Sequence, residues 1–161
     1  MLTQARLKDL LNYDQITGVF TWRMRTSNCI KVGDVAGADS GHGYLLIGVD
    51  GRRYKAHRLA WLYVHGHFPI EVIDHINGIG DDNRLCNLRS ASYEENARNA
   101  GAKSSNKSGL KGVCRNGNGW SSFCNVNGKQ NYLGYFDSPE KAFVAYKAFA
   151  QLHHGAFYKG E

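Results

Sequence analysis

The sequence has few of the features that cross-link a small protein or anchor it in a membrane. Its four cysteines are widely spaced and include no Cys-x-x-Cys pair, which argues against a zinc knuckle, because that site needs thiolates paired by short loops. The mean hydropathy is −0.46, and no apolar run approaches the roughly 18 residues of a membrane span. Met1 to Arg6 lack the apolar core of a signal peptide. We therefore expect a soluble cytoplasmic protein with reduced thiols.

Acidic residues are scarce in the last third of the chain. The 161 residues carry a formal net charge of +6. Residues 1–100 hold 12 basic and 11 acidic residues, whereas residues 101–161 hold 8 basic and 3 acidic ones. A basic segment of this kind indicates a polyanionic partner, most simply nucleic acid. The alternative is a surface that excess lysine keeps soluble.

Patterning over the first hundred residues predicts short helices and antiparallel strands. The dipeptide Asp50-Gly51, between an apolar strand over 44–49 and a return strand over 52–55, is a strong hairpin signal. Ser92 followed by Glu95 fits a capping box at the start of a helix. The expected elements are a helix over 2–11, a strand over 19–22, a loop over 33–43, strands over 44–49 and 52–55, a helix over 56–64, a strand over 71–73 that enters Asp74-His75, a loop over 76–91 and a helix over 93–99.

A small, polar and basic stretch over 101–108 has the composition of a linker. Beyond it the pattern predicts three strands, with Asn127-Gly128 as the second turn, followed by a helix that Pro139 opens. We expect the strands over 111–115, 120–126 and 129–135 and the helix as far as His153. The predicted fold class is therefore α+β.

Asp74, His75 and Asn96 form the constellation most suited to chemistry. Asp74 and His75 end a strand, so their side chains point to opposite faces, and a helix packed back across that strand brings Asn96 beside Asp74. Two oxygen ligands suit Mg²⁺ or Mn²⁺, and a neutral imidazole nearby can take a proton from water. Turn chemistry in an Asn-rich loop is the alternative reading of the same residues.

Several short motifs occur in order along residues 57–96. They are His57-Arg58-Leu59-Ala60, Ile73-Asp74-His75-Ile76-Asn77-Gly78, Asp82-Asn83, Asn87-Leu88-Arg89 and Asn96. In this order they resemble the HNH nuclease family, specifically the homing endonucleases of phages and mobile introns. That family's ββα-metal unit is a strand pair, a loop and a helix around one metal ion.

The resemblance implies a role for each matched residue. His75 would be the general base, and Asp74 and Asn96 would hold one divalent ion, Mg²⁺ or Mn²⁺. Asn87 would brace the loop and orient His75 through backbone hydrogen bonds. The last residue of the motif is Asn96 rather than His, and an amide oxygen is less suited than an imidazole to a tight transition-metal site. We expect His57 to be a structural hydrogen-bonding residue.

The C-terminal motifs resemble a second family. They are Leu110-Lys111-Gly112-Val113, Gly119-Trp120, Val126-Asn127-Gly128-Lys129, Leu133-Gly134-Tyr135-Phe136-Asp137, Pro139-Glu140-Lys141-Ala142, Ala145-Tyr146 and Gly155. They resemble the APETALA2-type DNA-binding domain, whose three-stranded sheet on one helix enters the major groove. The implied domains are a nuclease domain over 1–100, with its ββα-metal unit at about 57–100, a linker over 101–108 and a DNA-binding domain over 109–161.

Candidate DNA contacts follow from these resemblances and from local charge. On the C-terminal sheet they are Lys111, Arg115, Trp120 and Lys129, with a core position as the alternative for Trp120. Lysine at position 111 favours phosphate contacts over guanine readout. The other candidates, each with a surface or bracing role as the alternative, are Arg52, Arg53, Lys55, Arg58, Arg89, Lys103 and Lys107.

The sequence thus predicts a phage- or host-encoded, metal-dependent endonuclease that acts on double-stranded DNA as a monomer or a homodimer. A monomer with one site would nick, and a dimer would cut both strands. A DNA-binding regulator that retains the nuclease fold without cleaving is the alternative, although it would not need Asp74, His75, Asn87 and Asn96 together. An RNA-binding module is disfavoured because the paired aromatic motifs of RNA-binding sheets are absent.

Overall fold

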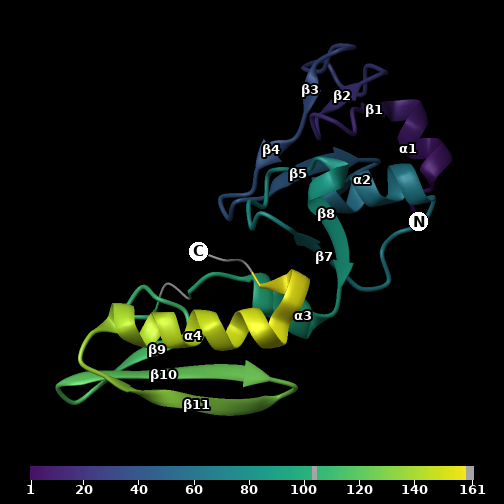
Figure 1. The fold of residues 1–161 in the computed structure, drawn as a ribbon. Helices are drawn as coiled ribbons and strands as arrows, with labels where there is room; N and C mark the ends of the chain where they lie inside the picture. The colour runs from purple at the N-terminus through teal and green to yellow at the C-terminus, as the bar shows by residue number, and fades with distance from the viewer. Residues whose placement is uncertain (103–104, 159–161) are drawn as a thin grey trace. The chain divides into compact units, whose positions relative to one another are not determined.

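The structure is a computed structural model that describes residues 1–102 and 105–158. The chain folds into two compact units, residues 1–93 and 94–161, and each is described by itself (Figure 1). None of the helices in the described part of the chain has the length and apolar character needed to cross a bilayer. The predicted α+β class is confirmed by the four α-helices and several small antiparallel sheets that the described residues form.

The first unit begins with a short helix and two three-stranded sheets. Thr3 caps the first helix by accepting a hydrogen bond from the backbone N–H of Arg6 at 3.2 Å. Asp50 and Gly51 both have positive φ, 47° and 75°, as a two-residue hairpin turn requires. The elements are α1 (Gln4–Leu10), β1 (Leu11–Tyr13), β2 (Phe20–Trp22), β3 (Val35–Ala36), β4 (Ala38–Asp39), β5 (Leu45–Val49) and β6 (Arg52–Lys55), with sheet orders β1-β2-β3 and β4-β5-β6.

The rest of the first unit supplies a core helix and a strand pair. Helix α2 (Ala56–His65) ends at Gly66, which adopts the left-handed conformation at φ 82°. Strand β7 (Val72–His75) pairs antiparallel with β8 (Leu88–Ala91), after the short 3₁₀ turn η1 (Leu85–Asn87). The core that supports these elements is mainly apolar. Its largest fully buried apolar side chains are Leu7, Leu11, Phe20, Ile47, Val49, Leu59 and Leu62.

The second unit is a sheet of three strands with one long helix across it (Figure 1). Ser138 caps the long helix by accepting from the backbone N–H of Lys141, and Pro139 opens it. The apolar contacts between sheet and helix include Cys124, Tyr146 and Ala150. The elements are α3 (Tyr93–Asn99), β9 (Val113–Asn116), β10 (Gly119–Val126), β11 (Lys129–Phe136), α4 (Pro139–His154) and η2 (Gly155–Phe157), with sheet order β11-β10-β9.

Several sequence-based element boundaries were wrong. The loop expected over 33–43 contains β3 and β4, and the loop expected over 76–91 ends in η1 and β8. The strand expected from Lys111 begins only at Val113, because Gly112 has φ 74°, outside the extended region. A Cβ at position 112 would also meet the Tyr146 ring at 2.2 Å, so glycine is needed there. The predicted division into a nuclease domain, a linker over 101–108 and a DNA-binding domain stays a prediction.

Candidate active site

Strand β7 places Asp74 and His75 at its end, both buried. Opposite them on β8, Arg89 faces Asp74 and Leu88 faces His75 in the antiparallel register. Successive strand residues point to opposite faces, so the carboxylate and the imidazole have different neighbours. The Asp74 carboxylate contacts the Arg89 guanidinium on β8, and the His75 imidazole packs near two other rings.

Asp74 forms a partly buried ion pair with Arg89. Both Nε and Nη2 of Arg89 lie 2.7 Å from Oδ2 of Asp74, and the two side chains are only 18% and 4% exposed. At this burial the pair is shielded from solvent much more than a surface pair would be. Arg89, a candidate for a DNA contact, is thus placed against a site carboxylate, and its role toward DNA stays a prediction.

His75 lies in a cluster of rings from three elements. The ring of His57, at the start of α2, is 4.9 Å from the His75 ring between centroids and nearly perpendicular to it at 84°. Tyr44, just before β5, is 5.5 Å from His57 and 6.0 Å from His75. No sequence motif identified Tyr44, because its place here depends on the path of the chain between β4 and β5.

Burial favours the neutral form of both imidazoles. It lowers the pKa of His57 to about 3, and the nearby charges of His75, Lys55 and Arg58 act in the same direction. Burial also lowers the pKa of His75 below 6.5, although a hydrogen bond with Asn83 and the nearby carboxylate of Asp74 oppose it. A neutral His75 can accept a proton at neutral pH.

Asn87 ties together the loop that follows His75. Its Oδ1 accepts from the backbone N–H of Asn77 at 3.0 Å, and its Nδ2 donates to Oδ1 of Asn77 at 3.0 Å and to the carbonyl of Asp82 at 2.8 Å. The carbonyl of Asn87 also accepts from the N–H of Ile76 at 2.9 Å. These hydrogen bonds hold the loop between Ile76 and Asp82 in one conformation, and the role of Asn87 in catalysis stays a prediction.

A second brace in the same loop centres on Asp82. Its carboxylate accepts from Nδ2 of Asn77 at 2.7 Å and from both Nε and Nη2 of Arg84, at 2.8 and 2.5 Å. The Arg84 guanidinium is the main reason that the pKa of Asp82 falls to about 2. The loop therefore keeps an ionised carboxylate near His75 over the whole physiological pH range.

The N-terminal segment supports this loop from outside. The Tyr13 hydroxyl donates to the carbonyl of Asn83 at 2.6 Å, and the N–H of Leu85 donates to the carbonyl of Gln15 at 3.0 Å. Gly18 lies so close that a Cβ on it would be 2.5 Å from the backbone nitrogen of Arg84. Residues before position 40, to which the sequence assigned no role, thus position the loop.

The donor types suit a hard divalent ion, although the structure does not assemble them into a metal centre. Within residues 1–102 and 105–158, no three or more His, Cys, Asp or Glu side chains gather into a group that could hold a metal ion. The carboxylate of Asp74 already pairs with the guanidinium of Arg89. Asn96 lies on α3 and belongs to the second unit. A carboxylate and an amide oxygen fit Mg²⁺ or Mn²⁺.

The basic hairpin contributes a cation beside the ring cluster. Arg52, Arg53 and Lys55 on β6 are exposed, and Nζ of Lys55 lies 4.2 Å from the centroid of the Tyr44 ring. Because Tyr44 packs near His75, the end of this hairpin lies close to the candidate base. Arg58 is half-buried, with its guanidinium 5.8 Å from the ring centroid of Phe68.

In the second unit the candidate DNA contacts differ in exposure. Arg115 is exposed and lies 5.6 Å from the ring of the half-buried Trp120, and Lys107 and Lys129 are exposed. Lys111 instead donates to backbone carbonyls at the end of α3. Lys103 lies outside the described residues.

Comparison with known proteins identifies the same stretch of chain. Residues 54–98 match the family model of an HNH endonuclease. No curated protein matches the chain, and no solved structure matches it. The matched stretch runs from the end of β6 through α2, β7 and β8 into α3. It therefore contains His57, Asp74, His75, Asn87 and Asn96, and it supports a nuclease.

Proposed function

We propose that the protein is a metal-dependent DNA endonuclease of the HNH homing type, in which His75 is the general base. The observation that carries this proposal is the buried His75 at the end of β7, next to the Asp74 carboxylate that pairs with Arg89, inside the stretch that matches an HNH endonuclease. Its imidazole is kept neutral by burial, as a base that works near neutral pH needs to be.

The reaction that fits these residues is hydrolysis of a phosphodiester bond. A nitrogen of His75 takes a proton from a water molecule while the water oxygen attacks phosphorus. The bond from phosphorus to the 3′-oxygen then breaks, and the leaving oxygen takes a proton from solvent water, which leaves a 5′-phosphate and a 3′-hydroxyl. A divalent ion held by Asp74 and Asn96 would stabilise charge on the phosphate and on the leaving oxygen. Asn87 keeps the loop after His75 in place, so that the imidazole has one orientation.

The C-terminal unit is proposed to target DNA as an APETALA2-like domain. Its support is the three-stranded sheet packed on one helix, together with the exposed cations Lys107, Arg115 and Lys129. The exposed Arg52, Arg53 and Lys55 are proposed to guide the duplex past the ring cluster near His75. A basic protein of this kind would act on double-stranded DNA in the cytoplasm.

A plasmid cleavage assay tests the proposal. Supercoiled plasmid is incubated with the protein in Mg²⁺, in Mn²⁺ and in EDTA, beside His75→Ala and the control His42→Ala, whose imidazole is exposed. We expect metal-dependent cleavage by the wild type and by His42→Ala and none by His75→Ala, with DNA affinity unchanged. Open circles would indicate nicking by a monomer, and linear product would indicate a dimer.

The plasmid carries a random-sequence insert library so that a cleavable site is present. Cleavage by His75→Ala at the wild-type rate would contradict the assignment of the base. DNA binding with no cleavage of any library member would favour the non-cleaving regulator.

A further inference from the structure

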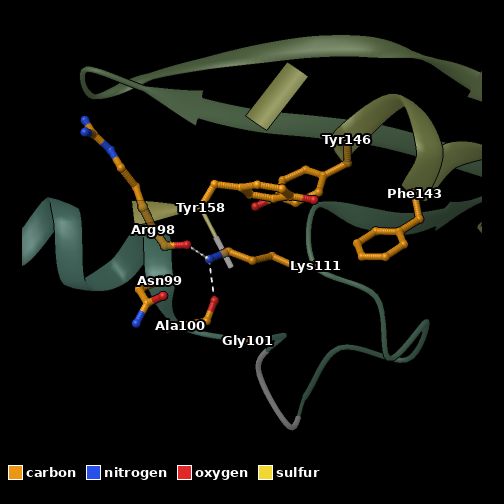
Figure 2. A pocket seen from close by; sticks show the side chains of 8 residues that line it. All are labelled: Arg98, Asn99, Ala100, Gly101, Lys111, Phe143, Tyr146 and Tyr158. Carbon is orange, nitrogen blue, oxygen red and sulfur yellow. Dashed lines mark hydrogen bonds between the residues drawn. The ribbon is translucent and has the colours of Figure 1, made fainter. Parts of the chain in front are cut away.

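The side-chain ammonium of Lys111 lies at the C-terminal end of α3 (Figure 2). It donates hydrogen bonds to the carbonyls of Ala97 and Arg98, each at 2.8 Å, and to the carbonyl of Ala100. The last carbonyls of a helix have no partner within the helix and form the negative end of its dipole. One cation therefore satisfies two of these groups, and the carbonyl of Ala100 just beyond the helix, at the end where a positive charge stabilises the helix.

Other contacts hold the same end of α3 within the second unit. Asn99 is buried, and Nη2 of Arg98 lies 3.4 Å from Oδ1 of Asn127 in the turn between β10 and β11. Lys111 and Arg98 line a small pocket with Tyr146 of α4 and Tyr158 (Figure 2). A helix of seven residues is too short to be stable alone. Its order therefore depends on the C-terminal sheet and helix.

The turn that Lys111 caps is the turn that holds Asn96. The carbonyl of Asn96 accepts a hydrogen bond from the N–H of Ala100 at 3.1 Å, while the carbonyls of Ala97 and Ala100 accept from Lys111. If this last turn frays, the bond that closes it at Asn96 is lost and the backbone of Asn96 is no longer held in the helix.

We propose that Lys111 is a positioning residue, which clamps the end of α3 and thereby fixes Asn96 as a metal ligand. This inference rests on the proposed function through the role of Asn96. It also differs from the phosphate contact that the sequence predicted for Lys111. A phosphate contact supports DNA affinity and its dependence on salt, whereas a clamp supports metal affinity and turnover.

Three measurements on the full-length chain separate these roles, using Lys111→Met. The control is Lys141→Met, which removes an exposed lysine of α4 that forms an ion pair with the exposed Asp137. The measurements are hydrogen exchange of the amides of residues 97–101 in EDTA, Mn²⁺ affinity by electron paramagnetic resonance, and DNA affinity in EDTA over a salt series. Lys111→Arg keeps the charge and tests rescue.

We expect Lys111→Met to speed amide exchange at 97–101 and to weaken Mn²⁺ binding by about tenfold or more, as loss of a residue that orients a ligand does. The cleavage kcat should fall while KM, DNA affinity and the salt slope stay at wild-type values, and Lys111→Arg should restore part of the Mn²⁺ affinity. Lys141→Met should match the wild type in every measurement.

Unchanged exchange and Mn²⁺ affinity, with a shallower salt slope for DNA binding, would overturn the proposal in favour of a phosphate contact. If Lys111→Met does not fold, Lys111→Gln, which keeps a hydrogen-bond donor, is measured in the same way against the same expectations. A wild type that binds no Mn²⁺ and cuts no DNA would refute the proposed function and the ligand role of Asn96. In that case the exchange measurement, which needs neither metal nor DNA, still decides whether Lys111 clamps α3.

Discussion

His57 and His75 meet edge to face, with ring centroids 4.9 Å apart and ring planes at 84°. Both rings are buried, and burial lowers the pKa of each. Two imidazoles this close repel one another when both are charged. The cluster is therefore most stable while both rings are neutral, which links the stability of the first unit to the protonation state of the candidate base.

Stability should fall on the acid side because of His57. Its pKa is about 3 in the folded protein against 6.5 ordinarily, so below pH 6.5 the unfolded chain binds a proton that the folded chain does not. The free energy of unfolding should be insensitive to this group above that pH and should drop by up to about 1.4 kcal/mol per pH unit below it. Urea titrations of His57→Gln should give a shallower decline than the wild type between pH 6.5 and 4. An exposed-histidine control, His42→Gln, should keep the wild-type decline, and an equally steep decline in His57→Gln would contradict this account.

The Asp74–Arg89 pair should contribute measurably to folding, since both side chains are largely shielded from water. Arg89→Met leaves a buried carboxylate without this guanidinium and should lower the free energy of unfolding by about 2 kcal/mol. The double variant Asp74→Asn/Arg89→Met should lose less than the sum of the two single variants. A double-mutant cycle in EDTA measures this coupling, and strictly additive losses would show that the pair does not interact in solution.

Gly18 should tolerate no side chain, because of its contact with the loop after His75. A Cβ there would lie 2.5 Å from the nitrogen of Arg84 and 2.6 Å from the carbonyl carbon of Asn83. Gly33 is a matched control, because it also has positive φ, 92°, but a Cβ there would have no atom within 4 Å. In both Gly18→Ala and Gly33→Ala the alanine is forced into the left-handed region, which costs about 1 kcal/mol. Gly18→Ala should cost about 1–3 kcal/mol more because of overpacking. If thermal unfolding shows equal losses of stability for the two variants, the N-terminal segment does not pack closely against this loop.

The exposed arginines of β6 should contribute to DNA affinity through phosphate contacts. Each phosphate neutralised changes the slope of log K against log salt by about 0.9. Arg52→Gln/Arg53→Gln should therefore reduce the magnitude of the slope by up to about 1.8, if both residues contact phosphate. Fluorescence anisotropy over a salt series in EDTA measures the slope. Lys31→Gln/Lys141→Gln removes the same charge from exposed sites elsewhere, and an identical change in that control would indicate a net-charge effect alone.

Local signals allowed much of the fold to be predicted from the sequence. The β5–β6 hairpin follows from Asp50-Gly51, and the start of α4 from Ser138-Pro139, because each depends on residues next to one another in the chain. Strands β3 and β4 have two residues each and exist only through their partners. A pattern along the sequence could not reveal them.

The candidate site was predictable to the same extent. The ordered motifs over 57–96, through their resemblance to HNH nucleases, pointed to Asp74, His75 and Asn87, which lie in the stretch that matches an HNH endonuclease. The roles of these residues stay predictions. Tyr44 and Tyr13 were missed, because each reaches the site region by tertiary packing from a distant segment. Lys111 was expected on a strand, but its side chain binds the carbonyls of a helix more than ten residues earlier in the chain.

Chemical rescue of the base tests the central claim most directly. His75→Gly removes a buried imidazole and leaves space for a free one. We predict that this variant binds DNA like the wild type and does not cleave it, and that added imidazole restores metal-dependent cleavage in a saturable manner, because the added base takes over the proton transfer. Cleavage by His75→Gly at the wild-type rate without imidazole would contradict the assignment of His75 as the general base.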